Sequence, residues 1–374
     1  MILAALVISF GLYHGASYRY AENPAMMQWD KDGPYIFYKN DSVLTLNYIR
    51  GNQKDGFYLD LKDYPSGTEI PAYSYFALDS SSFEFSIREE ITIPKTTYND
   101  GHKILAISDI ESGFKTFRDF LIAQNVVDKN LHWTFGKGHL VLLGDFMDRD
   151  FSTTQVLWFI YKLEKEAIEQ GGTVHFILGN HEIKNMQSNF ESTSPKYFHI
   201  AAILGKKPSQ LYDKNSLLGK WMASKNTIEK INGILFAHGG LHPDLRQHTT
   251  HLDQINQLVR ERYDQPFYPN AEKSLKQLLI SSHKGIAWYR GYFKDNLKEE
   301  VIQNGLAQFH ASAIVVGHTL QSKIKAHFGG KVIAIDVKHP KDYSKSIPNR
   351  KSEGLLIDEG IFYRVVHNGE KQKL

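Results

Sequence analysis

The sequence predicts an α/β protein in which a layered domain follows a small β module. Two patterns in its 374 residues support this prediction. From residue 103 onward, short continuous apolar runs alternate with stretches of helical spacing, which is typical of strands covered on both faces. Before residue 97 the pattern is one of short strands and turns. A chain of this length can bury a core large enough for both parts.

The small β module is expected over residues 28–97. Residues 35–38 and 43–49 have the composition of strands and flank the polar residues 39–42, which predicts a hairpin. The polar stretch 96–102 ends in a turn signal and separates the module from the larger domain. Further short strands are expected at residues 57–61 and 83–87.

The larger domain is expected over residues 103–366. Its strands are predicted at residues 103–108, 139–143, 173–178, 234–237, 313–316, 331–335 and 354–357. Helices are predicted at residues 114–124 and 153–170, and residues 252–263 also have helical spacing. Residues 190–230 contain several aromatic side chains, and we expect a cap insertion there that covers the active cleft and packs these aromatics in its own core.

The composition excludes several functional classes. The chain has no cysteine, which rules out disulfides, thiolate zinc sites and phosphatase mechanisms with a cysteine nucleophile. Its net charge of +3, from 44 basic and 41 acidic residues, gives no reason to expect nucleic-acid binding. No apolar stretch is long enough for a transmembrane helix, so a stable membrane anchor is not expected. Nothing in the sequence indicates the oligomeric state.

The first 17 residues resemble a signal peptide. An apolar run of about twelve residues is followed by small residues, as in the core and cleavage region of such peptides. This pattern favours export to the periplasm or the medium, although a positively charged start is missing. In the alternative, the segment is a buried N-terminal strand or helix and the protein stays in the cytoplasm.

Polar clusters follow five of the predicted strands. These clusters are Ser108-Asp-Ile-Glu-Ser-Gly113, Gly144-Asp-Phe-Met-Asp-Arg149, Gly179-Asn-His-Glu182, His238-Gly-Gly-Leu241 and Gly317-His-Thr319. A single cluster of this kind is more often a turn or a helix cap than a ligand set. Five in succession are hard to explain structurally, and the carboxyl ends of strands are where open sheets bind ligands. Converging carboxylates and imidazoles predict a pair of divalent metal ions.

This series of motifs resembles that of the calcineurin-like metallophosphoesterases, within them the serine/threonine phosphoprotein-phosphatase superfamily. The resemblance covers roughly residues 103–340. Residues 144–149 fit the pattern GDxxDR and residues 179–182 fit GNHE, while residues 238–245 are similar to HGGLxPDL. The β module and the aromatic-rich composition are similar to the Shewanella-like bacterial branch, which includes a cold-active protein-tyrosine phosphatase. The resemblance implies a metallophosphoesterase β-sandwich flanked by helices.

The resemblance also implies roles for single residues. The implied metal ligands are Asp109 at the first site, Asp145 bridging both ions, and Asn180, His238 and His318 at the second. Glu111 is also expected to bind the first ion, because a carboxylate at that spacing is a competent ligand. The implied catalytic residues are His181 as the proton donor, Asp148 as its orienting carboxylate, and Arg149 and Arg290 as phosphate ligands. In this arrangement two cations about 3.5–4 Å apart share a bridging hydroxide and stabilise charge on the phosphoryl group.

The chain departs from the family pattern at the first metal site. Glu111 stands where the family has histidine, and Leu320 stands where many relatives have a second histidine. Oxygen ligands alone favour Mn²⁺ or Mg²⁺ at this site, whereas the nitrogen-containing second site also suits Fe²⁺ or Zn²⁺. In the alternative, Glu111 points away and the first site is weak or empty.

The favoured function is that of a metal-dependent phosphatase acting on a phosphorylated protein or a small phosphoester. Phosphotyrosine and phosphoserine or phosphothreonine substrates are not distinguished by the sequence. The alternatives are a dinucleoside polyphosphate hydrolase and a pseudophosphatase that binds without hydrolysis because its first metal site is defective. A basic stretch comprises Lys338, Lys341, Lys345, Arg350 and Lys351. Such a stretch is usually a solvated loop, but it also attracts anionic substrates in some proteins.

Overall fold

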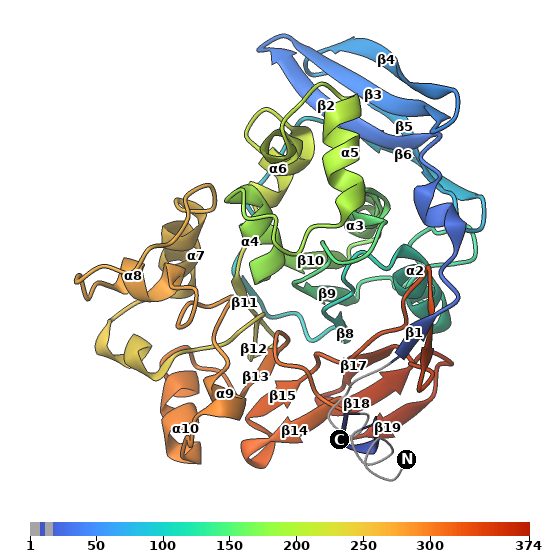
Figure 1. Ribbon diagram of the computed structural model, residues 1–374. Helices are drawn as coiled ribbons and strands as arrows, with labels where there is room; N and C mark the ends of the chain where they lie inside the picture. The colour runs from blue at the N-terminus through green and yellow to red at the C-terminus, as the bar shows by residue number, and fades with distance from the viewer. Residues whose placement is uncertain (1–7, 12–17) are drawn as a thin grey trace.

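The centre of the protein is a sandwich of two six-stranded sheets, shown in Figure 1 by a computed structural model that describes residues 8–11 and 18–374. The first sheet has the order β10-β9-β8-β17-β18-β19, with bounds Thr173–Ile177, His139–Leu143, Ile104–Ile107, Glu353–Asp358, Ile361–Val366 and Lys371–Lys373. The second has the order β14-β15-β13-β12-β11-β7, with bounds Lys325–His327, Val332–Ala334, Ala313–Val316, Ile234–Ala237, Ile228–Ile231 and Thr97–Tyr98. The predicted α/β fold is confirmed.

Alternate residues of the central strands face two separate cores. Ile104 and Ala106 of β8 belong to the cluster between the sheets, together with Phe236 of β12. Leu105 and Ile107, the intervening residues, belong to the cluster on the outer side. Successive side chains of a strand point to opposite faces, so a strand buried on both faces needs an apolar residue at every position. This explains why the continuous apolar runs predicted these strands correctly.

Helices cover the sandwich and connect its strands. The predicted helices are confirmed as α2 (Phe114–Ala123), α3 (Thr153–Glu169) and α7 (Leu252–Arg260). The remaining helices are α4 (Asn180–Met186), α5 (Pro195–Ile203), α6 (Leu217–Ala223), α8 (Leu275–Ile280), α9 (Gly291–Lys294) and α10 (Glu299–Ala307). Short 3-10 turns are η1 (Pro24–Met27), η2 (Pro208–Leu211), η3 (Pro243–Gln247) and η4 (Phe328–Gly330). Helix α3 contacts β10 and helix α7 contacts β11, so each of these sheets is covered from outside.

The N-terminal strands lie above helix α3 in Figure 1. Strands β2 (Asp32–Asn40), β3 (Val43–Asn52) and β4 (Gly56–Pro65) form one antiparallel sheet, and β5 (Ile70–Phe76) pairs with β6 (Ser81–Ile87). The pairing of β2 with β3 confirms the predicted hairpin. The Trp158 indole nitrogen of α3 donates to the Pro34 carbonyl at 2.8 Å, which fixes this module on the larger domain.

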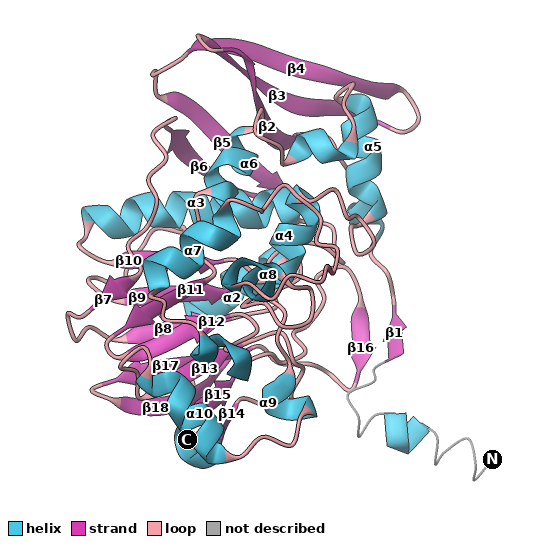
Figure 2. Ribbon diagram, turned by 90° about the vertical axis from the view of Figure 1, so that its left-hand side faces the viewer, coloured by secondary structure: helices cyan, strands magenta, loops and turns pink. Residues whose placement is uncertain are grey.

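Two strands differ from the expected boundaries of the β module and the larger domain. Strand β7 falls at the expected end of the module, at Thr97–Tyr98, but pairs with β11 and therefore belongs to the second sheet. Strand β19, beyond the expected end at residue 366, pairs with β18 and completes the first sheet. A third pair, β1 (Tyr18–Tyr20) and β16 (Lys345–Ile347), lies apart from both sheets in Figure 2.

Residues 190–230 lie beside the β module instead of over the cleft. Their helices α5 and α6 contact β4 and β2. Trp221 is buried against Phe176, and its indole nitrogen donates to Glu164 at 2.8 Å. Trp221 and Tyr197 of this segment therefore pack against α3, which differs from the expected cap, whereas Phe198 is exposed. Its beginning does reach the site, because the Thr193 hydroxyl donates to Asp148 at 3.0 Å.

Among the described residues, no helix combines the length and the apolar character that a membrane span requires. The predicted signal peptide at residues 1–17 lies outside the described residues, apart from residues 8–11. Export therefore stays a prediction.

Candidate metal centre

The carboxyl ends of six parallel strands meet at one edge of the sandwich. Strands β8, β9 and β10 are parallel in the first sheet, and β12, β13 and β15 are parallel in the second. Each strand is followed by a polar residue within three positions of its end. These residues are Asp109, Asp145, Asn180, His238, His318 and Asp336. Five of them are residues that the sequence predicted as metal ligands.

Asp145, His238 and His318 form a group suited to hold a metal ion. One ligand atom from each lies within 4.8 Å of the others, and all three residues are buried. The His238 Nδ1 atom hydrogen-bonds the Leu143 carbonyl at 2.7 Å, which directs Nε2 toward Asp145 Oδ2 at 3.1 Å. The buried Asn180 Oδ1 has no hydrogen-bond partner among the described residues, and His238 Nε2 has only the Asp145 carboxylate beside it. A divalent ion would satisfy these atoms, so the residues fit such an ion.

The charges of this group favour metal binding. Burial raises the pKa of Asp145, but the imidazoles of His238 and His181 outweigh it and hold this pKa well below the usual range. Burial and the nearby His238 lower the pKa of His318 to about 2, so His318 is neutral and can donate a lone pair. Burial also lowers the pKa of His238, but Asp145 and Asp109 raise it to about 10. Without a metal ion, a proton on His238 therefore balances the carboxylates, and a metal ion would displace it.

Carboxylates crowd the neighbouring position. Asp109, Glu111, Asp145 and Asp336 line one hollow of about 250 Å³. Burial raises the pKa of Asp109 to about 7, against the effect of His238, and Asp145 adds to the rise. Burial and the charges of Asp109 and Glu111 raise the pKa of Asp336 well above its usual range. Buried carboxylates that oppose one another's ionisation hold protons, and a cation bound there would take the place of those protons.

Asp336 is a candidate ligand that the sequence analysis missed. It is buried and follows the predicted strand 331–335 directly. The other predicted ligands also follow buried strands, and the same signal applied to this strand would have found Asp336.

Glu111 contacts two cations. Its Oε1 atom lies 3.0 Å from Arg149 Nη1, and its Oε2 atom accepts a hydrogen bond from Lys341 Nζ at 2.7 Å. Lys341 and Arg149 therefore lower the pKa of Glu111, although burial raises it. Both carboxylate oxygens are thus occupied by side chains from other parts of the chain.

The predicted proton donor and its carboxylate are in contact. His181 Nδ1 lies 2.8 Å from Asp148 Oδ2, and the other oxygen of Asp148 accepts a hydrogen bond from Asn185 at 2.8 Å. His181 Nε2 faces the site, 3.7 Å from Asp145 Oδ2. Burial lowers the pKa of His181, but Asp145 and Asp148 outweigh it and raise this pKa. Asp148 therefore holds the ring through Nδ1, and Nε2 is available for proton transfer in the site.

The two predicted phosphate arginines each lie beside a histidine of the site. Arg149 Nη2 is 3.5 Å from His181 Nε2, and Arg290 Nη2 is 3.3 Å from His318 Nδ1. Arg290 also donates to the His318 carbonyl and precedes helix α9. Planar guanidinium groups in this position suit the oxygens of a phosphoryl group.

Strained backbone concentrates at the site. Six of the ten predicted site residues have positive φ, namely Asp109, Glu111, Asp145, Asp148, Arg149 and His318. Non-glycine residues rarely adopt this conformation, and it is common at functional sites. Gly144 has φ 78°, and a Cβ atom there would lie 2.6 Å from His238 Nδ1. Glycine before Asp145 therefore lets the strand ends approach closely.

Two hollows meet at the metal centre. The smaller, of about 250 Å³, contains the carboxylates, and the larger, of about 530 Å³, extends past Lys184, Trp288 and Lys294. Both are lined by the same four residues, Arg149, His181, Arg290 and His318. A phosphoryl group held by these residues would lie where the hollows join.

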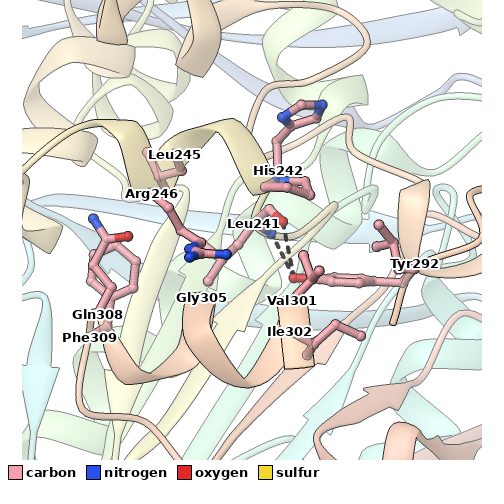
Figure 3. A pocket seen from close by; sticks show the side chains of 12 residues that line it. Leu241, His242, Leu245, Arg246, Tyr292, Val301, Ile302, Gly305, Gln308 and Phe309 are labelled. Atoms are coloured by element: carbon pink, nitrogen blue, oxygen red, sulfur yellow. Dashed lines mark hydrogen bonds between the residues drawn. The ribbon is translucent and has the colours of Figure 1, made fainter. Parts of the chain in front are cut away.

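A third hollow, shown in Figure 3, has no comparable chemistry. It encloses only about 20 Å³ between η3 and helix α10, beneath Leu241 and Tyr292. The Tyr292 hydroxyl accepts a hydrogen bond from the Leu241 backbone at 2.9 Å, as the dashed lines show. This contact supports the segment that follows His238.

Comparison with known proteins agrees with this geometry. The model of the calcineurin-like phosphoesterase family matches residues 102–322. Shewanella-like protein phosphatase 1 of Plasmodium berghei is 28% identical over 229 residues, which cover 59% of this chain and 61% of that protein. Shewanella-like protein phosphatase 2 of Arabidopsis thaliana is 23% identical over 319 residues, which cover 71% of this chain and 79% of that protein. The match thus spans less than two thirds of the Plasmodium protein.

A solved structure extends the similarity to almost the whole fold. The cold-active protein-tyrosine phosphatase of a psychrophilic Shewanella species has a TM-score of 0.78 and 29% sequence identity, covering 92% of this chain and 99% of that one. The family and the Shewanella-like branch expected from the sequence are confirmed, and the expectation of a metal-dependent phosphatase agrees with the names of these relatives. With more than half of its length matched by the family model, the chain belongs to the calcineurin-like phosphoesterase family.

Proposed function

We propose that this chain is a metal-dependent phosphomonoesterase that removes phosphate from proteins. The observation that carries the proposal is the convergence of a metal-ligand group, a His–Asp pair and two arginines where the two hollows join. Metal-ligand groups alone also occur in structural sites. The proton donor and the phosphate-binding cations beside this one give it the parts of a hydrolytic site. The relatives named protein phosphatases support a phosphoprotein substrate.

Two divalent ions would be held by different ligand sets. Asp145, Asn180, His238 and His318 would hold one ion, which suits Mn²⁺, Fe²⁺ or Zn²⁺. Asp109 and Asp336, sharing Asp145, would offer oxygen ligands alone to the other, which favours Mn²⁺ or Mg²⁺. When bound, such a pair lowers the pKa of water and stabilises negative charge on phosphoryl oxygens.

The side chains of the site would bind the phosphoryl group and protonate the leaving group. Arg149 and Arg290 would bind the phosphoryl oxygens. His181 would give its Nε2 proton to the oxygen of the leaving side chain, while Asp148 keeps the ring oriented through Nδ1. The raised pKa of His181 keeps this proton available near neutral pH.

Glu111 would act as a positioning residue in this scheme. Its oxygens hold Arg149 and Lys341. Asp336 would then supply a ligand oxygen in place of the nitrogen that the family's histidine supplies. A Glu111→Gln variant would then lower affinity for phosphate more than affinity for Mn²⁺. If Glu111 binds the metal ion directly, as the sequence predicts, the same variant would instead weaken Mn²⁺ binding measured by calorimetry.

The test is hydrolysis of synthetic phosphotyrosine, phosphoserine and phosphothreonine peptides with Mn²⁺ and then with excess chelator. We expect release of phosphate from at least one peptide, its loss on chelation, and its abolition in Asp145→Asn. The exposed Asp264→Asn serves as the matched control and should behave as the wild-type protein does. Binding of the peptides without hydrolysis would support a pseudophosphatase. Faster cleavage of dinucleoside tetraphosphate than of any peptide would support the polyphosphate alternative.

A further inference from the structure

The smaller hollow carries more positive charge than the reaction requires. Besides Arg149 and Arg290, its lining includes Arg19, Lys338 and Lys341. These five cationic side chains stand against four carboxylates, Asp109, Glu111, Asp145 and Asp336. Two divalent ions carry four positive charges and would by themselves balance the four carboxylates. A phosphoester dianion bound at the metal centre would then leave a positive excess in the hollow.

The loop that supplies Lys338 and Lys341 is held in place by hydrogen bonds to the larger domain. His339 Nε2 donates to the Ser108 carbonyl at 3.0 Å, and burial lowers the pKa of His339 to about 4, so the ring is neutral. Asp342 accepts hydrogen bonds from the backbone N–H groups of Lys115 and Thr116 at 2.7 and 2.9 Å, at the start of helix α2. Lys338 and Lys341 are therefore each next to a buried anchor, unlike residues of a solvated loop.

The N-terminal strand adds a cation from the opposite direction. Strand β1 pairs with β16, and Arg19 lies opposite Ser346 in this ribbon, which Figure 2 shows at the side of the molecule. Arg19 therefore lines the same hollow as Lys338 and Lys341, although it lies far from both in the sequence. Once metal ions balance the carboxylates, these three cations would favour an anion beside them.

We propose that Arg19, Lys338 and Lys341 form a subsite for a second anionic group on the substrate, close to the phosphoester. This inference rests on the proposed function and names its substrate class, a phosphopeptide with an acidic side chain or a second phosphate beside the phosphorylated residue. The shared residues at the junction place the reacting phosphoryl group next to the subsite. Guanidinium and ammonium groups together bind either carboxylate or phosphate oxygens.

The experiment compares three phosphopeptides of one sequence that carry Gln, Glu or a second phosphoserine beside the phosphorylated residue. For the wild-type protein we expect kcat/KM to rise by roughly five- to tenfold from Gln to Glu or phosphoserine, as two favourable charge contacts would give. The rise should come mainly from KM and should shrink at high salt. In Arg19→Gln combined with Lys338→Gln, the ratio should fall to about twofold or less.

The matched control is Lys345→Gln, which removes an exposed lysine of the same ribbon that does not line the hollow. This variant should keep the wild-type ratio. A gain with either acidic group supports the subsite, and the larger gain identifies the preferred anion. Equal kcat/KM values for all three peptides, or an undiminished ratio in the double variant, would overturn the inference while leaving the phosphatase assignment intact. Failure of the wild-type protein to hydrolyse any of the peptides would instead overturn the proposed function.

Discussion

Two buried clusters of charged residues can be compared in this molecule, and they use charge differently. One is the metal centre. The other, the module anchor, consists of Asp32, Tyr35, Thr154, Lys196 and Tyr197, where the β module meets the larger domain. Asp32 and Asp145 are each 4% exposed, so burial does not distinguish the clusters.

In the module anchor, the chain itself satisfies the buried charges. Asp32 pairs with Lys196 and accepts a hydrogen bond from the Tyr35 hydroxyl at 2.6 Å. Lys196 also donates to the Phe151 carbonyl at 2.9 Å. In the metal centre, carboxylates face one another, and Asn180 Oδ1 has no partner among the described residues. The comparison teaches that satisfied buried charges mark a structural role and unsatisfied ones mark a place for a ligand.

The largest expected effect is at the proton donor. In His181→Asn, hydrolysis of an alkyl phosphate should fall by about 10²–10⁴-fold, because an alkoxide needs a proton to leave. Hydrolysis of p-nitrophenyl phosphate should fall much less. The exposed His367→Asn is the control and should hydrolyse both substrates normally. Equal losses on the two substrates would show that His181 has a structural role, like the residues of the module anchor.

At the module anchor, Lys196→Met should lower the free energy of unfolding by about 3–5 kcal/mol, because the buried charge of Asp32 loses its cationic partner. Urea denaturation provides the measurement. The control is Lys39→Met, which breaks the exposed pair with Asp63 and should cost no more than about 1 kcal/mol. Similar losses in both variants would contradict the contrast between buried and exposed pairs.

Metal addition should separate the two clusters directly. Mn²⁺ at 100 times its dissociation constant should stabilise the folded protein by about 2.7 kcal/mol, since only the folded chain assembles the ligands. The shift should be the same in Lys196→Met and absent in Asp145→Asn, as thermal denaturation with and without chelator would show. A shift that persists in Asp145→Asn would place the metal ion elsewhere.

The smallest effect concerns pH at the wall of the metal centre. The pKa of His339 is about 4 in the folded protein, below the 6.5 expected for the unfolded chain, so the unfolded state binds the proton first as pH falls. This histidine should therefore cost the protein about 2 kcal/mol of stability between pH 7 and pH 5. His339→Gln keeps a donor for the Ser108 carbonyl and should lose that much less over the same interval in urea titrations. Equal losses of stability between pH 7 and pH 5 in the wild-type protein and the variant would show that His339 is not the group responsible.

The central strands and most predicted ligands could be identified from the sequence because both follow local rules. A strand such as β8 is buried on both faces and needs an apolar residue at every position. A polar residue that follows it directly therefore lies at the edge of the sheet. The contact between Glu111 and Lys341 was not predictable, since 230 positions separate them and no local pattern couples them. The position of Trp221 was not predictable either, because an aromatic residue packs equally well under a cap or against α3.

The left-handed backbone at the site restricts which amino acids evolution can try there. Asp109, Asp145 and His318 all have positive φ, a conformation that aspartate, asparagine, histidine and glycine tolerate better than other residues do. A substitution at these positions must therefore meet two requirements: it must supply a ligand atom, and it must adopt a positive φ. Branched residues would fail the second requirement before their chemistry mattered. Among the folded members of a library of variants at these positions, those four amino acids should accordingly be enriched.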